Sequence, residues 1–164
     1  MIAELLNTFE STLTFLERSV ADLSEEEMVR QPPGVPNHAT WTLGHVIWSC
    51  QGMAGELGVD EWLPDDWTSL FGTGSTPTSV ASRYPKKTEL LTMLTAAADR
   101  LRDVLLAADE SALGQPLPDV QVREILPTLG HAFLQVLAAH TAFHAGQLAV
   151  WRAAIGANPV AVFV

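Results

Sequence analysis

Large apolar residues recur every three or four positions along four stretches of the chain, and this spacing predicts four amphipathic α-helices. The predicted helices span residues 2–23, 40–53, 86–113 and 127–156. Thr40 is a suitable N-cap for the second helix, Pro127 suits the first turn of the fourth, and Gly156 suits its C-terminal cap. No alternation of strands and helices is visible. We therefore expect an all-α fold, a four-helix bundle formed by a single domain over residues 1–164.

The connections between the predicted helices differ in length and character. Ser24 and Glu27 have the spacing of a capping box, which predicts a short helical turn before a proline-rich loop. Residues 58–85 form a long connection between the second and third helices and show no sustained period. Such a connection is usually functional or disordered, and aromatic residues argue against disorder. These aromatic residues either cover a functional site or fix the connection to the bundle; they are Trp62, Trp67 and Phe71. The topology, up-down or crossover, stays open.

Composition and charge narrow the classes of function. The chain of 164 residues has 9 lysines and arginines against 19 aspartates and glutamates, a formal net charge of −10, which argues against nucleic acid as a partner. No apolar run approaches the ~20 residues that span a bilayer, and no export signal is visible, so we expect a cytoplasmic protein without a membrane anchor. The single cysteine, Cys50, excludes zinc sites built on paired cysteines and is expected to pack as a small apolar residue.

Helix geometry separates the five histidines. His140 and His144 are four residues apart, so they lie about 40° apart on one helical face and can share an ion. His131 lies about 180° around the same helix from His140 and cannot join that pair. His38 precedes the second helix and is expected to be a surface or capping residue.

His45 lies on the second helix among residues that belong in a core. Trp41 and Trp48 share its helical face, so its imidazole is expected to point inward, and Gly44 beside it permits a close approach by another helix. One inward histidine on the second helix and an inward pair on the fourth would form a metal site in a bundle core. The other interpretation is a buried histidine that hydrogen-bonds to a carbonyl group, and the spacing alone leaves both open.

Two segments together resemble the DinB/YfiT-like family of metal-dependent proteins. They are His140-Thr-Ala-Phe-His144-Ala-Gly146-Gln147-Leu148, with Arg152 and Gly156 downstream, and Trp41-Thr-Leu-Gly44-His45. The resemblance covers nearly the whole chain and implies a four-helix bundle whose divalent metal ion is bound by His45, His140 and His144. It also implies a homodimer and, as in several members, a transferase or isomerase that uses bacillithiol or mycothiol. The sequence departs from the family at Ala145, where a basic or bulky residue is frequent, so no particular substrate is carried over.

Three neutral imidazoles without a carboxylate leave the full charge of a divalent transition metal and open coordination positions. Imidazole suits Zn, Ni, Cu and Fe alike, so the expected cofactor is a divalent ion such as Zn, Ni or Fe. Gln147 shares the stripe of His140 and His144 and could hydrogen-bond to a ligand or to a histidine's second nitrogen, and the alternative is a structural contact between helices. The candidate pocket residues are Gln147, Trp41 and Trp48, whereas Trp151 is expected in the core.

These features favour a metal-dependent enzyme that acts on a small-molecule substrate. The resemblance implies transfer to or from a low-molecular-weight thiol, and the open metal site alone would also suit hydrolysis. The glutamate of a His-Glu-x-x-His protease is missing between His140 and His144. Two further hypotheses are a non-catalytic metal-binding or stress-response module and an interaction module. The apolar tail at residues 157–164 either packs on its own bundle or forms the expected homodimer contact.

Overall fold

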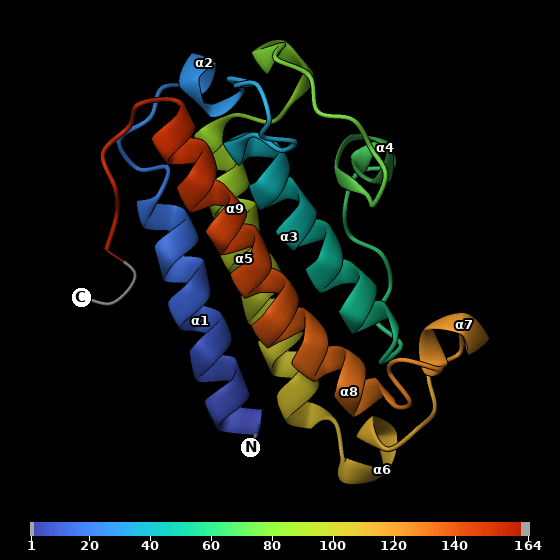
Figure 1. Ribbon diagram of the computed structural model, residues 1–164. Helices are drawn as coiled ribbons and strands as arrows, with labels where there is room; N and C mark the ends of the chain where they lie inside the picture. The colour runs from blue at the N-terminus through green and yellow to red at the C-terminus, as the bar shows by residue number, and fades with distance from the viewer. Residues whose placement is uncertain (1, 162–164) are drawn as a thin grey trace.

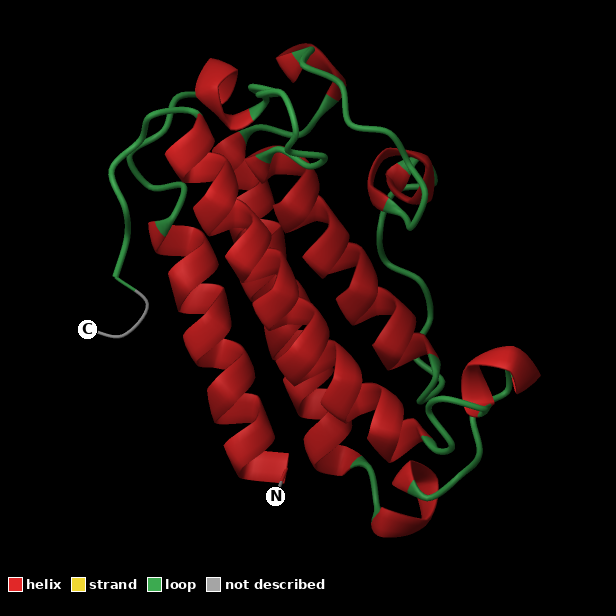
Figure 2. Cartoon of the chain, in the orientation of Figure 1, coloured by secondary structure: helices red, strands yellow, loops and turns green. Residues whose placement is uncertain are grey.

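The computed structural model describes residues 2–161 and is built from helices and loops (Figures 1 and 2). Within this range the extended pairing is limited to an isolated bridge between Pro116 and Thr128. The long helices are α1 (Ile2–Arg18), α3 (Ala39–Gly55), α5 (Lys87–Ala107) and a continuous segment of α8 (Leu129–Leu134), a π-helical turn (Gln135–His140) and α9 (Thr141–Ala154). The short helices are α2 (Glu25–Met28), α4 (Trp67–Phe71), the 3-10 helix η1 (Ala81–Arg83), α6 (Glu110–Leu113) and α7 (Val120–Arg123). The predicted all-α class is confirmed.

The long helices lie side by side, with α3 packed against α5 and α9, and α1 packed against α9 and α5. The helix α1 and the α8–α9 segment run in one direction, and α3 and α5 run in the other (Figure 1). Because α3 and α5 are parallel neighbours, residues 56–86 must return along the length of the bundle. The 17 residues of α3 span about 25 Å, which explains why this connection is long. The bundle therefore has a crossover connection, the alternative that the sequence could not decide.

Some helix ends differ from the predicted ones, and at the starts of α3 and α8 a capping side chain marks the observed position. The helix α1 ends at Arg18, before the predicted end at residue 23, and the last segment begins at Leu129, after Thr128 as its N-cap, rather than near Pro127. The expected N-cap Thr40 lies inside α3, and the helix begins one residue earlier, at Ala39. The capping box of Ser24 and Glu27 is present as predicted.

His38 is the N-cap of α3, and it is fully buried rather than on the surface. Its Nδ1 accepts a hydrogen bond from the backbone N–H of Trp41 at 3.1 Å, and its Nε2 donates to the backbone oxygen of Thr78 at 3.0 Å. These two bonds require a neutral ring. Burial lowers the pKa of His38 to about 4, in agreement with that requirement. The capping expectation for His38 is thus correct and the surface expectation is wrong.

One hydrophobic cluster contains residues from all the long helices. Trp151 lies in this core with no exposed surface, as predicted. Cys50 is also buried, and desolvation raises the pKa of its thiol to about 12, so it is a packing residue and carries no thiolate at neutral pH. None of the helices in residues 2–161 combines the length and the apolar character that a membrane span requires.

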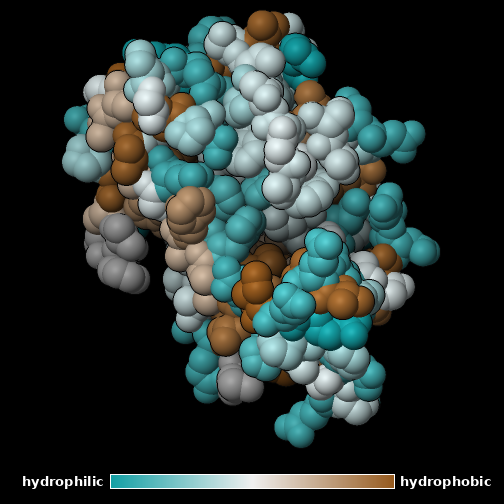
Figure 3. Space-filling model, turned by 45° about the vertical axis from the view of Figure 1, so that its right-hand side comes forward, coloured by the Kyte–Doolittle hydropathy of each residue, from teal (hydrophilic) through white to brown (hydrophobic). Residues whose placement is uncertain are grey.

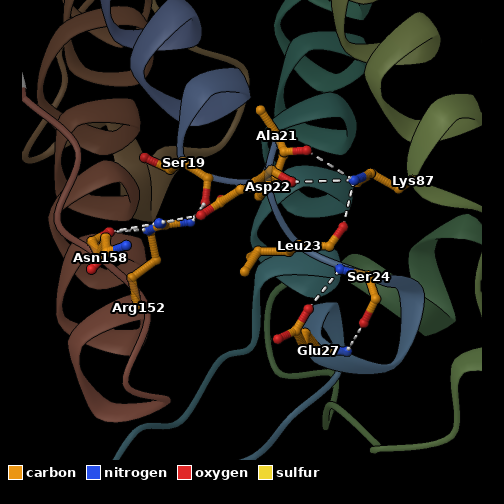
Figure 4. Close-up of polar contacts among 10 residues, drawn as sticks. Ser19, Ala21, Asp22, Leu23, Ser24, Glu27, Lys87, Arg152 and Asn158 are labelled. Atoms are coloured by element: carbon orange, nitrogen blue, oxygen red, sulfur yellow. Dashed lines mark hydrogen bonds and ion pairs between the residues drawn. The ribbon is translucent and has the colours of Figure 1, made fainter.

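Arg152 joins three parts of the chain in the interior (Figure 4). Its side chain is 3% exposed, and it donates to the backbone oxygen of Ser19 and, through two parallel bonds, to the carboxylate of Asp22. Its other two N–H groups donate to the backbone oxygen of Asn158. All the guanidinium donors are therefore satisfied, as a buried arginine requires. The hydrogen bonds from Arg152 hold the pKa of Asp22 below its usual range.

The start of the apolar tail packs on the bundle, because Ala157 and Val160 contact the hydrophobic core and Asn158 is held by Arg152. This arrangement agrees with the first of the two interpretations of the tail. Residues 162–164, which belong to the same prediction, lie outside the described residues.

The surface carries several large apolar side chains. In the view of Figure 3, apolar groups gather in the lower half of the visible face and polar groups surround them. The large apolar residues that are at least 50% exposed are Val80, Leu106, Val120, Ile125, Leu134, Phe143 and Val150.

The long connection is fixed to α3 by tryptophan hydrogen bonds and by one close contact. Trp67 donates from its indole to the backbone oxygen of Gly44 at 3.1 Å, and Trp48 donates to Thr68 Oγ1 at the same distance. The ring of Phe71 lies directly against Gly44, so a Cβ at that position would overlap it. The close approach expected at Gly44 is therefore made by α4, a short helix within the connection.

We predict that Gly44→Ala destabilises the protein by about 1–3 kcal/mol, because the added methyl group must displace a fully buried ring. Gly52→Ala on the same helix is the matched control, since its Cβ would meet no atom within 4 Å. That control should gain up to about 1 kcal/mol from helix propensity. Urea unfolding measures both values, and equal stability of the two variants would contradict the assigned contact.

Candidate metal centre

The fold brings His45 of α3 together with His140 and His144 of the last helical segment. The Nε2 atom of His140 lies 3.1 Å from the Nε2 of His45 and 3.1 Å from the Nε2 of His144. The three nitrogen atoms that could bind an ion all lie within 4.8 Å of one another. His131 is exposed and hydrogen-bonds to Thr128 Oγ1, so it lies apart from the group, as the helix geometry predicted.

Hydrogen bonds to the outer ring nitrogens determine where two of these imidazoles carry their protons. His45 donates from Nδ1 to the backbone oxygen of Phe71 at 2.7 Å. His144 donates from Nδ1 to Gln147 Oε1 at 3.0 Å. A neutral ring that is protonated on Nδ1 has a lone pair on Nε2. Both rings therefore direct a lone pair toward His140.

This arrangement suits a cation. Whichever nitrogen of neutral His140 carries the proton, its Nε2 can donate to at most one of the two lone pairs that face it. One positive ion would satisfy all three lone pairs together, and nitrogen donors of this kind bind transition metals. The outer Nδ1 atom of His140 is buried and has no hydrogen-bond partner in the described residues. No hydrogen bond at Nδ1 therefore holds the ring in an orientation that would turn Nε2 away from the group. The donor set thus fits the divalent metal that the sequence predicted.

Burial keeps the three histidines neutral. Desolvation lowers the pKa of His45, and it lowers the pKa values of His140 and His144 to about 4, with a smaller contribution from the charges of neighbouring histidines to the latter two. The neutral form is the one that binds metal. The site is therefore ready to accept an ion at neutral pH without first losing protons.

Aromatic rings hold the imidazoles in place. Trp41 stacks on His45 with the ring centroids 4.6 Å apart and an interplanar angle of 10°, and Trp48 stacks on it at 5.5 Å. The rings of Phe143 and His144 meet edge to face with their centroids 5.5 Å apart, and the side chain of Phe143 is largely exposed. The partly exposed members, His140 and Trp48, place the group near the surface rather than at the centre of the bundle.

A separate cavity of about 160 Å³ lies between α1 and α5, and its lining includes Leu13, Thr95 and Arg102. None of the three histidines borders it. This cavity therefore takes no part in the metal centre.

Sequence reasoning found most of this site but missed two contributors. Gln147 forms the hydrogen bond to a histidine's second nitrogen that was one of the interpretations left open for it. The backbone oxygen of Phe71 was missed because a main-chain group leaves no signal in residue identity. Asn37, whose Nδ2 donates to Gln147 Oε1 at 3.2 Å, was missed because it lies in the proline-rich loop, far from Gln147 in sequence. The π-helical turn does not disturb the pair of histidines, because it ends at His140 and α9 continues regularly to His144.

The family model described as DinB superfamily matches residues 8–148, a range that contains all three histidines. No curated protein matches the chain significantly.

We predict that the purified protein binds one divalent transition metal ion per chain. His45→Ala, His140→Ala and His144→Ala should each weaken zinc binding by about 100-fold or more, beyond the 10–100-fold typical for residues outside the ligand shell. His131→Ala should leave zinc binding unchanged, because this exposed side chain lies outside the group. Elemental analysis measures the metal content per chain, and equilibrium dialysis measures the zinc affinity of each variant. Absence of bound metal, or equal losses in His131→Ala and His140→Ala, would contradict the assignment.

Proposed function

Because this chain belongs to the DinB superfamily and brings three neutral histidines together, we propose that it is a metal-dependent enzyme that transfers a group to or from a low-molecular-weight thiol. The observation that carries the proposal is the composition of the site. It offers three imidazole nitrogens, and the group of potential ligands in the described residues contains no carboxylate and no cysteine.

The charge of the site favours an anionic ligand. When bound, a divalent ion held by three neutral nitrogens retains its full charge and lowers the pKa of a thiol or water that binds beside them. A free thiol has a pKa near 8.5 and needs only a small decrease to ionise at pH 7, whereas bulk water starts at about 15.7. A zinc ion held by three histidines also lowers the pKa of bound water to about 7, so the donor set suits both a thiol and hydrolysis, and the preference for a thiol rests on the family resemblance.

The residues around the histidines orient and shield the site and do not act as acids or bases. Within residues 2–161, the hydrogen-bond and ring partners that the three imidazoles have outside their own group are Phe71, Gln147, Trp41, Trp48 and Phe143. None of them ionises near neutral pH. The indole rings of Trp41 and Trp48 both stack on the His45 ring and shield it from water. A reaction that needs no separate general base, such as attack by an ionised thiol, agrees with this set of residues.

We propose further that two copies of the chain associate through the outer face of the α8–α9 segment. Between Leu129 and Ala154 the sequence has one charged residue, Arg152, and that side chain is buried. The exposed face is therefore uncharged on a chain with a net charge of −10, and it would lose no ion hydration when covered by the same face of a second copy. The exposed residues of the segment are His131, Leu134, Gln135, Ala139, Ala142, Phe143, Gly146, Ala149, Val150, Ala153 and Ala154.

The thiol proposal predicts a spectroscopic response. In protein loaded with cobalt or nickel, a thiol should shift the d–d bands at neutral pH and add a sulfur-to-metal charge-transfer band. The probes are bacillithiol, mycothiol, glutathione and coenzyme A, and His140→Ala is the control that should remove the response. A spectrum that none of these thiols changes would contradict thiol transfer and favour hydrolysis or a role without catalysis.

The dimer proposal predicts that light scattering at micromolar concentration finds a dimer and that Val150→Glu converts it to a monomer. Val150 is 62% exposed in the single chain, so the substitution should not affect folding. Val120→Glu, at a 66% exposed position on α7, is the matched control and should remain dimeric. Truncation after Pro159 should also preserve the dimer. A monomeric protein, or a dimer that survives Val150→Glu, would contradict this interface.

A further inference from the structure

Gln147 connects a metal-site histidine to a residue of the loop before α3. Its Oε1 accepts two hydrogen bonds, one from Nδ1 of His144 at 3.0 Å and one from Nδ2 of Asn37 at 3.2 Å. Asn37 immediately precedes His38, the N-cap of α3, and Gln147 lies on α9. Asn37 and Gln147 are both partly buried. The three residues form a chain of hydrogen bonds that begins in a loop and ends at the histidine group.

The direction of this chain determines which nitrogen of His144 can bind an ion. A carboxamide has an accepting oxygen and a donating NH₂ group, and rotation by 180° exchanges them. With its oxygen toward His144, Gln147 keeps the proton on Nδ1 and leaves a lone pair on Nε2. With its NH₂ group toward His144, it would require a lone pair on Nδ1 and a proton on Nε2. The second arrangement blocks the nitrogen that faces His45 and His140.

We propose that Asn37 is a positioning residue that sets the tautomer of His144 through Gln147. By donating to Gln147 Oε1, Asn37 stabilises the orientation in which that oxygen faces His144. If Gln147 turned over while Asn37 kept its orientation, two NH₂ groups would face each other and both hydrogen bonds of Oε1 would be lost. This inference rests on the metal site of the proposed function, but the tautomer is a property of the chain itself and exists without the metal.

Asn37→Asp tests the proposal because it replaces the donor by an acceptor of the same shape. The carboxylate of Asp would attract the NH₂ group of Gln147, turn the carboxamide over and move the proton of His144 from Nδ1 to Nε2. The expected result is a loss of zinc affinity of about 10–100-fold, although no ligand is removed. The effect of charge alone has the opposite sign, since an added negative charge near the site would strengthen cation binding. The substitution should fold, because an acidic residue beside the N-terminus of α3 is favourable there.

Gln147→Glu and the double variant complete the test. Gln147→Glu offers only acceptors, so it should keep the proton of His144 on Nδ1 and retain zinc affinity. In Asn37→Asp combined with Gln147→Glu, the residue that faces His144 again only accepts, so most of the lost affinity should return. A merely structural role for Asn37 would instead make the double variant worse than Asn37→Asp. Asn7→Asp, at an exposed position on α1, adds the same charge elsewhere and controls for its long-range effect.

The direct measurement is long-range ¹H–¹⁵N NMR of the histidine rings in metal-free protein at pH 7.5. The wild-type protein should show His144 protonated on Nδ1, and Asn37→Asp should show it protonated on Nε2. A wild-type His144 protonated on Nε2, or an Asn37→Asp variant with unchanged tautomer and unchanged zinc affinity, would overturn the proposal. The tautomer is measured without metal or thiol. A result that contradicts the tautomer proposal can therefore be distinguished from a failure of metal binding or of thiol transfer.

Discussion

The contact between Phe71 and Gly44 is the constraint on which both the fold and the site depend. Only a glycine lets the ring of Phe71 lie directly against the backbone of α3, and this contact seats α4 at the middle of the crossover connection. The same residue then supplies the backbone oxygen that accepts from Nδ1 of His45. One packing contact therefore fixes the path of the long connection and the proton position of a site histidine.

The three imidazoles are close together because other interactions stabilise an arrangement that is unfavourable by itself. At least one of the lone pairs at the centre of the group has no proton to accept and is repelled by its neighbours, and burial adds a desolvation cost to each ring. Stacking by Trp41 and hydrogen bonds to Phe71 and Gln147 oppose this repulsion. The rigid surroundings preserve a geometry that a bound cation would convert from repulsive to attractive, as expected of a preformed metal site.

The far end of the bundle supports the site indirectly by fixing the position of α9. Arg152 joins α9 to Asp22 and to the backbone at the end of α1 (Figure 4). Lys87 donates to backbone oxygens at the same end of α1, and so brings the start of α5 to that point. The side chains of Arg152 and Lys87 therefore lie beyond the C-terminal end of α1, toward which its backbone carbonyl groups point. The helix dipole favours positive charge at this end. The helix that carries His144 is thus held at its last turn as well as at the site.

The sequence by itself determined the elements whose signals are local. Apolar periodicity predicted the long helices, and the spacing of four residues between His140 and His144 required that both lie on one helical face. The resemblance of the sequence to a known family added His45 to this pair. Tertiary structure alone decided the crossover of residues 56–86, because helix periodicity carries no information about direction. It also decided the burial of His38, the role of the Phe71 oxygen and the contact of Asn37 with Gln147. Each of these features either joins groups that are distant in sequence or depends on a main-chain atom. Contacts of both kinds leave no periodic pattern in the amino-acid sequence.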